Sequence, residues 1–298
     1  MLPSARPHRS VLYMPGSNAR ALEKAKTLPV DALIFDLEDA VSPAQKLQAR
    51  TLVCAAAVAA KAGAYGGRKI CIRANALDTP WGREDLIAIA SAGADAVLLP
   101  KVNCAEDVAA ARSILQAAKA CPHTELWVMM ETPLAILQAQ QIASAPGVSA
   151  LIMGTADLVT DLHAQHSAER LEVITSLNIC VLAARAYGLM VLDGVYLDLA
   201  DQSGFEAQCR QGLALGFDGK TVIHPSQLDA ANRIFAPSTD DLERAAGIIT
   251  AHSEAAAQGK GVVLVDGKLI ENLHVVQAQR IVAMAAAIEV AAANSVVS

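Results

Sequence analysis

The chain has 298 residues, of which 53% are hydrophobic and 18% charged, and it carries a formal net charge of −6 with a pI near 5.6. This composition argues against a disordered chain, and the absence of a Lys/Arg stripe interleaved with aromatic residues argues against a nucleic-acid partner. No apolar run approaches the ~18 residues of a membrane span, and no apolar secretion-signal core follows the N-terminus. We therefore expect a cytoplasmic protein with a small-molecule substrate and no membrane partner.

Eight short apolar runs recur along the chain, and each is followed by a polar turn. Near-continuous apolar strands of this kind are buried on both faces, as in parallel sheets covered by helices. The eight predicted strands span residues 10–15, 31–36, 69–75, 94–101, 125–131, 148–154, 188–194 and 217–225.

Ala- and Leu-rich segments with helical periodicity lie between these strands, at residues 19–26, 43–61, 105–119, 134–143, 170–187 and 204–215. Eight strand–helix units without a GxGxxG motif after the first strand favour a closed (β/α)8 TIM barrel over a doubly wound sheet. We expect residues 1–258 to form the barrel, and residues 259–298 to form a C-terminal helical appendage. This appendage would cover the site or reach a neighbouring subunit.

Charged and polar side chains gather at the carboxyl ends of the predicted strands, where barrel enzymes build their active sites. Any single acid there could instead cap a helix or pair with Arg73. The group comprises Asp36, Glu38, Asp39, Arg73, Asn75, Lys101, Glu131, Asp157, Asp193, Lys220 and His224.

Glu131 and Asp157 follow neighbouring predicted strands, without a Cys or His cluster nearby. Two carboxylates make an oxygen-only site of the kind that binds Mg²⁺, which takes its other ligands from water and substrate. Mn²⁺ fits almost as well. The alternative for this pair is an ion pair with an Arg or a Lys.

Three basic residues have two interpretations each. Arg73 can hold a substrate carboxylate with a bidentate fork, or form a salt bridge with Asp36 or Glu38. Lys101 could be a Schiff-base nucleophile, although a lysine beside so many acids should stay protonated. His224 could act as an acid or base, or line a ligand site as a structural residue.

Seven motifs in a fixed order, from about Ser10 to Ile234, resemble the citrate lyase β-subunit-like family of the HpcH/HpaI aldolase superfamily. They are "LYMPGSNARALEKA", "DALIFDLEDAV", "IRANALDTPWGREDL", "LLPKV", "METPLAI", "GTADL" and "GFDGKTVIHPSQL". This family includes malyl-CoA and citramalyl-CoA lyases. The resemblance implies a Mg²⁺-dependent barrel that forms a homotrimer or hexamer and acts on a CoA thioester.

The resemblance also implies roles for individual residues. Glu131 and Asp157 match the metal ligands, and Arg73 matches the arginine that holds the oxo-acid carboxylate. "DGKLIENLH" places Glu271 where the lyases commonly carry an aspartate that enters the neighbouring subunit's site. The acids that support the metal and its waters are Asp36, Glu38 and Asp39, and the residues in the region that receives the CoA nucleotide are Tyr13, Pro15, Arg20, His224 and Pro225.

The expected reaction is a retro-Claisen cleavage of a 3-hydroxyacyl-CoA thioester, of the citramalyl or malyl type, to an oxo acid and acetyl-CoA. Glu271 from another copy of the chain would remove the hydroxyl proton, and Arg73 and Asp36 are the other expected catalytic residues. The alternatives are a malyl-CoA-type thioesterase, a class II aldolase acting on CoA-free hydroxy acids, a citryl-thioester lyase subunit, and a non-catalytic protein that binds a CoA ligand.

Overall fold

The computed structural model describes residues 6–257, 262–265 and 267–296. The chain divides into two compact units, and the division falls after Phe235. One unit runs from His8 to Phe235, and the second contains Arg6, Pro7 and the described residues from Ala236 onward.

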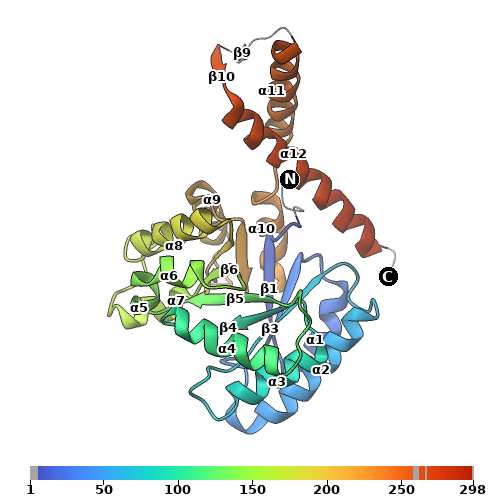
Figure 1. The fold of residues 1–298 in the computed structure, drawn as a ribbon, viewed down its shortest axis with the longest axis vertical. Helices are drawn as coiled ribbons and strands as arrows, with labels where there is room; N and C mark the ends of the chain where they lie inside the picture. The colour runs from blue at the N-terminus through green and yellow to red at the C-terminus, as the bar shows by residue number, and fades with distance from the viewer. Residues whose placement is uncertain (1–5, 258–261, 266, 297–298) are drawn as a thin grey trace. The chain divides into compact units, whose positions relative to one another are not determined.

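The first unit is a closed barrel of eight parallel strands in sequence order, which confirms the predicted (β/α)8 fold (Figure 1). Strand β1 pairs with both β2 and β8, so the ring has no free edge. The strands are β1 Ser10–Pro15, β2 Ala32–Asp36, β3 Lys69–Arg73, β4 Ala96–Leu99, β5 Glu125–Met130, β6 Val148–Met153, β7 Met190–Asp193 and β8 Gly219–Val222.

Helices surround the strands and connect each to the next (Figure 1). Three of the α-helices end at a glycine with positive φ, Gly93, Gly188 or Gly216, which turns the chain back towards the barrel. The helices are α1 Ala19–Lys24, α2 Lys46–Lys61, α3 Gly82–Ala92, α4 Ala105–Ala117, α5 Pro133–Leu137, α6 Ala139–Ser144, α7 Thr155–Asp161, α8 Ile174–Tyr187, α9 Gln202–Leu215 and α10 Leu228–Ile234, with 3-10 turns η1 Ala25–Thr27, η2 Pro43–Gln45 and η3 Pro225–Gln227.

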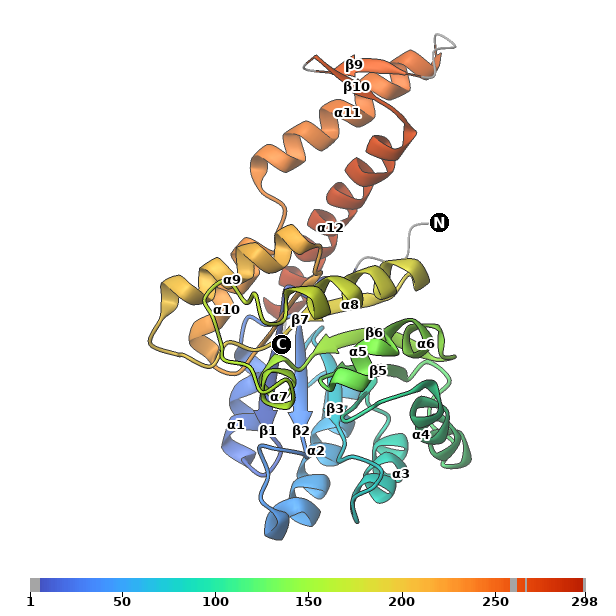
Figure 2. The same cartoon turned by 90° about the vertical axis from the view of Figure 1, so that its left-hand side faces the viewer.

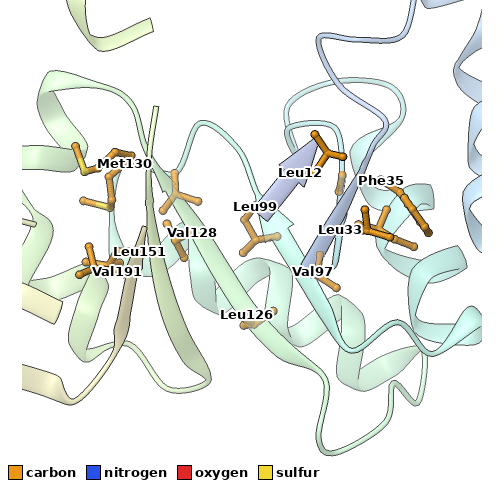
Figure 3. Packing of buried hydrophobic residues seen from close by; sticks show 14 of the residues in the cluster. Leu12, Leu33, Phe35, Val97, Leu99, Leu126, Val128, Met130, Leu151 and Val191 are labelled. Atoms are coloured by element: carbon orange, nitrogen blue, oxygen red, sulfur yellow. The ribbon is translucent and has the colours of Figure 1, made fainter. Parts of the chain in front are cut away.

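Strand side chains alternate between two apolar cores. One core fills the barrel interior and includes Ile34, Leu98 and Trp127. The other lies between strands and helices and includes Leu33, Phe35 and Val128, some of whose packing Figure 3 shows. Burial on both faces explains why the strands read as continuous apolar runs in the sequence.

The second unit consists of helix α11 Thr239–Ala257, the antiparallel strands β9 Val263–Val265 and β10 Lys268–Ile270, and helix α12 Asn272–Val296. Figure 2 shows the two strands beside α11. The boundary at residue 259 expected from the sequence lies outside the described residues, and the division of the chain there stays a prediction.

Helix α12 is long and apolar enough to cross a membrane by length and composition, with a mean hydropathy of 1.4 over Asn272–Ala293. Only 11% of its most apolar window is buried within the described structure. Glu289 and Asn294 interrupt the apolar sequence. The expectation of no membrane partner stays a prediction.

Gly16 connects β1 to α1 and has no room for a side chain. A Cβ at this position would lie 2.5 Å from Asp36 O and 2.8 Å from Val53 Cγ1. Overpacking of this kind costs about 1–3 kcal/mol. We expect Gly16→Ala to lower the free energy of unfolding by that amount in urea denaturation.

Gly247→Ala is the matched control, because a Cβ there meets no atom within 4 Å and Gly247 lies inside helix α11. We expect this variant to unfold at the same or a higher urea concentration than the parent protein. Equal stability of the Gly16→Ala protein and its parent would contradict the close approach of β1 and β2 at this point.

Candidate active site

Asp36 and Arg73, at the ends of β2 and β3, form a buried bidentate ion pair. The Arg73 Nε and Nη2 atoms each donate to one Asp36 oxygen over 2.7 Å. The same carboxylate accepts the backbone N–H groups of Glu38 at 2.9 Å and Ala40 at 3.0 Å. Asp36 therefore fixes both the guanidinium and the acidic loop that follows β2. This is the salt bridge that the sequence left open as the alternative for Arg73.

The remaining Arg73 nitrogen, Nη1, faces the other two acids of the loop. It lies 2.8 Å from Glu38 Oε2 and donates to Asp39 Oδ2 over 3.2 Å. Glu38 Oε2 is buried and accepts no hydrogen bond, and burial raises the pKa of Glu38 to about 8. Asp39 is exposed. Glu38 is therefore a carboxyl group that can exchange a proton near neutral pH.

Glu131 and Asp157 converge on one ammonium group, Lys101 Nζ. Glu131 directly follows β5 and is only 2% exposed. Its Oε1 accepts the Lys101 backbone N–H at 2.7 Å and lies 3.7 Å from Nζ. Asp157, in the first turn of α7, accepts a hydrogen bond from the same Nζ. The ends of β4, β5 and β6 thus bring two carboxylates to one cationic position.

The charges of this cluster depend on one another. Burial raises the pKa of Glu131 above its ordinary value. Burial lowers the pKa of Lys101, whereas the hydrogen bond to Asp157 and the charge of Glu131 raise it. The two raising effects together outweigh burial, so the pKa lies above its ordinary value. The protonated state expected for Lys101 agrees with this direction and disfavours a free amine for Schiff-base chemistry.

Two backbone features, at Lys101 and Gly154, shape the cluster. Lys101 has a φ of 52°, which is unusual for a residue with a side chain. A Cβ on Gly154, at the end of β6, would lie 2.4 Å from Glu131 Cβ and 2.8 Å from its Oε2. Only glycine leaves Glu131 the space to stand beside β6.

The donor set fits a Mg²⁺ ion. Glu131 and Asp157 supply two carboxylates at a position that already attracts a cation, and Lys101, with 39% of its side chain exposed, has space to withdraw. No group of three or more Asp, Glu, His or Cys residues suited to a metal occurs in the described parts of the chain. Two carboxylates, completed by water and substrate, match the way Mg²⁺ is commonly held.

Tyr13 lies beneath the arginine. Its ring faces the Arg73 guanidinium, with 5.0 Å from the ring centroid to Cζ, and its hydroxyl contacts Met129 Sδ at 3.4 Å. Burial raises the pKa of this phenol far above its ordinary range. Tyr13 therefore supports Arg73 from inside the barrel, and its contact with CoA stays a prediction.

The other residues expected near CoA lie around the β8–β1 side of the barrel. Pro15 ends β1, Arg20 is exposed on α1, and His224 is exposed just after β8. His224 Nδ1 accepts the Ser226 backbone N–H at 3.2 Å and caps the short η3 turn that begins at Pro225. Because β1 pairs with β8, these groups share one stretch of the rim.

Glu271 belongs to the second compact unit, between β10 and α12. It is exposed, and its backbone N–H donates to His274 Nδ1 at 3.0 Å. Its expected role in proton transfer stays a prediction.

Sequence reasoning missed Lys46 as part of the site. This lysine is buried on α2, and its Nζ donates to the carbonyl oxygens of Leu37 and Glu38 at 2.7 Å. It holds carbonyl groups of the acidic loop, whereas Asp36 holds its N–H groups. A lysine in the first turn of a helix, where the dipole disfavours a cation, was the available signal.

Asp193 and Lys220, which the sequence placed at strand ends, form a separate buried cluster with Arg170. Arg170 Nη1 lies 2.7 and 2.9 Å from the two Asp193 oxygens, and Lys220 Nζ lies 3.1 Å from Oδ2. Although burial raises the pKa of Asp193, the two cations lower it below its ordinary value.

The closed barrel carries acids and a guanidinium at its carboxyl rim, the place where (β/α)8 enzymes build their active sites. Residues 9–225 match the HpcH/HpaI aldolase/citrate lyase family, and the chain belongs to this family. Members of this family act on CoA thioesters as lyases or thioesterases.

Two relatives cover nearly the whole chain. A (3S)-malyl-CoA thioesterase from Cereibacter sphaeroides is 47% identical over 288 residues, covering 97% of this chain and 98% of that protein. The citrate lyase subunit beta of Escherichia coli is 36% identical over 273 residues, covering 90% and 89%.

A solved structure resembles the whole chain as well. Protein CitE from Mycobacterium tuberculosis, in complex with magnesium, acetoacetate and coenzyme A, has a TM-score of 0.75 and 26% identity, covering 96% of this chain and 100% of that one.

Lys101→Met tests the shared cationic position. Without the ammonium, the Glu131 and Asp157 carboxylates face each other uncompensated, which destabilises the metal-free protein. A divalent ion would relieve the repulsion, and it no longer has to displace a cation. We expect Mg²⁺ to raise the Tm of Lys101→Met by several degrees more than that of the parent protein. An equal Mg²⁺-induced shift in both proteins would contradict the overlap of the two cation positions.

Glu38→Gln tests the proton held by the acidic loop. Because the folded-state pKa of Glu38 is raised to about 8, the unfolded chain releases this proton first. The Glu38 contribution to stability is therefore greatest at low pH and is lost as pH rises from about 4.5 to about 8. In metal-free urea denaturation, we compare the unfolding free energy of Glu38→Gln with that of the parent protein. We expect the difference to favour the variant more above pH 8 than below pH 4.5. Glu84→Gln, at an exposed position on α3, should show no such change, and a flat profile for both variants would contradict the raised pKa.

Proposed function

We propose that this protein is a Mg²⁺-dependent enzyme that acts on the CoA thioester of a 3-hydroxy acid of the malyl type. The observation that carries the proposal is the convergence of the Glu131 and Asp157 carboxylates on one cationic position, Lys101 Nζ. The magnesium and coenzyme A of the Mycobacterium tuberculosis relative support it, as does the 47% identity to a (3S)-malyl-CoA thioesterase. Mn²⁺ would be held by the same oxygen ligands.

Glu131 and Asp157 would hold the ion, which supplies Lewis-acid chemistry at a carbonyl or hydroxyl oxygen when bound. Arg73 would position the substrate carboxylate through Nη1, which Asp36 does not bind and which the substrate would share with Glu38 and Asp39. Asp36 and the Tyr13 ring keep the guanidinium in place, so the orientation of the substrate would be set before it binds.

Glu38 would hold or move the proton. Its pKa of about 8 places the carboxyl close to the operating pH of a general acid or base. Its Oε2 atom accepts no hydrogen bond within the described structure and lies beside Arg73. Glu271, from the same or another copy of the chain, is the second candidate for proton transfer.

Thioester hydrolysis is the first candidate reaction. The similarity to the malyl-CoA thioesterase spans both proteins almost from end to end and exceeds that to the citrate lyase subunit. Water would add to the thioester carbonyl, and the products would be a hydroxy acid and free CoA.

Cleavage of the carbon–carbon bond, the reaction expected from the sequence, is the second candidate. The 36% identity to a citrate lyase subunit beta favours it. Loss of the hydroxyl proton would break the bond between the hydroxyl-bearing carbon and the carbon next to the thioester carbonyl. The products would be an oxo acid and the enolate of acetyl-CoA, and the enolate would then take up a proton.

The assembly and location of the protein are part of the proposal. The exposed apolar residues of α12 would pack against a second copy in a cytoplasmic homotrimer or hexamer, as the family resemblance implies. Leu273, Val276, Val282 and Val290 are between 40% and 62% exposed in the single chain, so pairing of copies would remove apolar surface from water.

Incubation with (3S)-malyl-CoA and Mg²⁺ separates the two reactions. Hydrolysis gives malate and free CoA, whereas cleavage gives glyoxylate and acetyl-CoA, and chromatography with thiol detection scores each product. We expect malate and CoA, with activity lost in EDTA. Glyoxylate and acetyl-CoA in equal amounts would replace hydrolysis with cleavage, and full activity in EDTA would contradict the metal-dependent site.

The same assay, carried out with Asp157→Asn and Glu131→Gln, tests whether these two residues hold the ion. Loss of a metal's charge stabilisation costs several kcal/mol, so we expect each variant to lose at least about 100-fold in kcat/KM. Asp161→Asn, four residues along α7 and exposed, is the matched control and should retain activity.

A further inference from the structure

The side chain of Asn103 links the loop that carries Lys101 to the residue after Glu131. Its Oδ1 atom accepts a hydrogen bond from the Thr132 hydroxyl at 2.6 Å, and its Nδ2 atom donates to the Lys101 carbonyl oxygen at 3.4 Å. Thr132 directly follows Glu131 in the sequence. Asn103 therefore ties the loop after β4 to the end of β5.

The start of helix α4 holds Asn103 in place. The Asp107 side chain accepts the backbone N–H groups of Asn103 at 2.8 Å and of Cys104 at 3.2 Å. Asp107 is the third residue of α4, and these bonds belong to the capping box of that helix. Asn103 is thereby fixed to the first turn of a 13-residue helix.

The Thr132 hydroxyl is held at the other end of the bridge. Thr132 is the N-cap of α5, and its Oγ1 atom accepts the Ala135 backbone N–H at 3.1 Å. The hydroxyl proton goes to Asn103, so the donor and an acceptor position of this group are both used. The bridge therefore joins two helix starts, those of α4 and α5.

The Glu131 carboxylate in turn depends on the backbone of Lys101. Its Oε1 atom accepts the Lys101 N–H at 2.7 Å and lies 3.7 Å from Lys101 Nζ. One oxygen thus meets both the backbone donor and the cationic position. A donor of this kind orients a metal-binding carboxylate, and loss of such an outer partner commonly lowers metal affinity by about 10–100-fold.

Lys101 presents this N–H from an unfavourable backbone conformation, with a φ of 52°. Such a conformation is costly for a residue with a side chain and persists where the surrounding contacts enforce it. Two contacts do so here, because Glu131 accepts the Lys101 N–H and Asn103 donates to the Lys101 carbonyl oxygen. Removal of the Asn103 amide leaves one of the two.

An asparagine suits this place because it is neutral and bifunctional. The bridge needs an acceptor for the Thr132 hydroxyl and a donor for the Lys101 carbonyl oxygen, and a side-chain amide supplies both. An aspartate would supply only acceptors, and its charge would change the balance around the Lys101 ammonium.

We propose that Asn103 is a positioning residue of the metal site. Its bridge from Lys101 to Thr132 keeps the Lys101 N–H on Glu131 Oε1 and so orients this carboxylate for a divalent ion. The inference rests on the proposed metal-dependent function and extends it to a residue that acts through Lys101 and Thr132.

Asn103→Leu tests the bridge, because leucine has a similar size and neither polar atom. Free Mn²⁺, which gives an electron paramagnetic resonance signal, is titrated with the full chain, so that binding is measured without substrate. We expect the Mn²⁺ dissociation constant to rise about tenfold, the low end for loss of an outer partner. A folded variant with the parental constant would overturn the inference alone. No Mn²⁺ binding by the parent protein would overturn the proposed function, and the inference with it.

Asn232→Leu is the matched control, because Asn232 makes the same kind of bridge at the amino end of the barrel. Its Oδ1 atom accepts the Ser10 hydroxyl at 2.7 Å, and its Nδ2 atom donates to the Pro29 carbonyl oxygen at 2.6 Å. Both asparagines are half-buried. We expect Asn232→Leu to unfold at a lower urea concentration but to keep the parental Mn²⁺ affinity. An equal loss of Mn²⁺ affinity in both variants would reduce the effect to destabilisation and overturn the positioning role.

The other end of the bridge provides a second test. Thr132→Val removes the hydroxyl at nearly constant shape, and Thr132→Ser keeps it. We expect valine to weaken Mn²⁺ binding at least about tenfold and serine to restore it. Equal Mn²⁺ affinity of these two variants would overturn the inference, and they decide it even where Asn103→Leu does not fold.

The double variant Asn103→Leu/Thr132→Val shows whether the two residues act together. It should bind Mn²⁺ about as weakly as Thr132→Val alone, because both changes break the same bridge. A loss of affinity equal to the product of the two single losses would contradict a shared bridge and overturn the inference.

Hydrogen exchange of the Lys101 amide, measured in EDTA, tests the link without a metal. We expect faster exchange in Asn103→Leu than in the parent protein and in Asn232→Leu, because the N–H would lose its fixed position on Glu131. Equal exchange in the three proteins would overturn the step from Asn103 to Glu131.

Discussion

The meeting of the Glu131 and Asp157 carboxylates at one cationic position is the constraint on which the account depends. The parallel pairing of β5 with β6 sets the two residues side by side, and Gly154 leaves the space that Glu131 occupies. Two negative groups at such a place need a cation, because burial alone already raises the pKa of Glu131. In the metal-free chain the Lys101 ammonium meets this need. The same demand makes the site suited to a divalent ion.

A second constraint fixes Arg73 and the acidic loop that follows β2. Asp36 joins the ends of β2 and β3 by binding Arg73 with both oxygens while it holds the backbone of the acidic loop. Lys46 holds that loop through the carbonyl oxygens of Leu37 and Glu38. The salt bridge and a substrate-binding arginine, which looked like alternatives from the sequence, are compatible, because Asp36 uses two nitrogens and Nη1 faces the remaining acids. This arrangement buries Glu38, and burial raises its pKa to about 8. The raised pKa suits Glu38 to proton transfer near neutral pH.

The sequence was sufficient for the barrel and for the position of Glu131 and Asp157 along the chain, because strands buried on both faces produce unbroken apolar runs that end at the rim. It also placed Lys101 at this rim and left open the ion pair of the two acids with a lysine, which the structure has. It was insufficient for the backbone conformation of Lys101 and for Arg170. Both adopt a positive φ, which no side-chain pattern records, and Arg170 finds Asp193 across 23 residues of chain. The apolar pattern of α12 predicted a helix in the tail, but not that α11 groups with it in one compact unit. That division depends on which helices contact one another.

The most direct measurement is anomalous diffraction from crystals of the protein grown with Mn²⁺, which takes oxygen ligands as Mg²⁺ does. The account predicts one ion per chain, coordinated by carboxylate oxygens of Glu131 and Asp157, with the Lys101 side chain moved out of its place between them. An ion bound elsewhere, or no ion while Lys101 still bridges the two acids at saturating Mn²⁺, would contradict it.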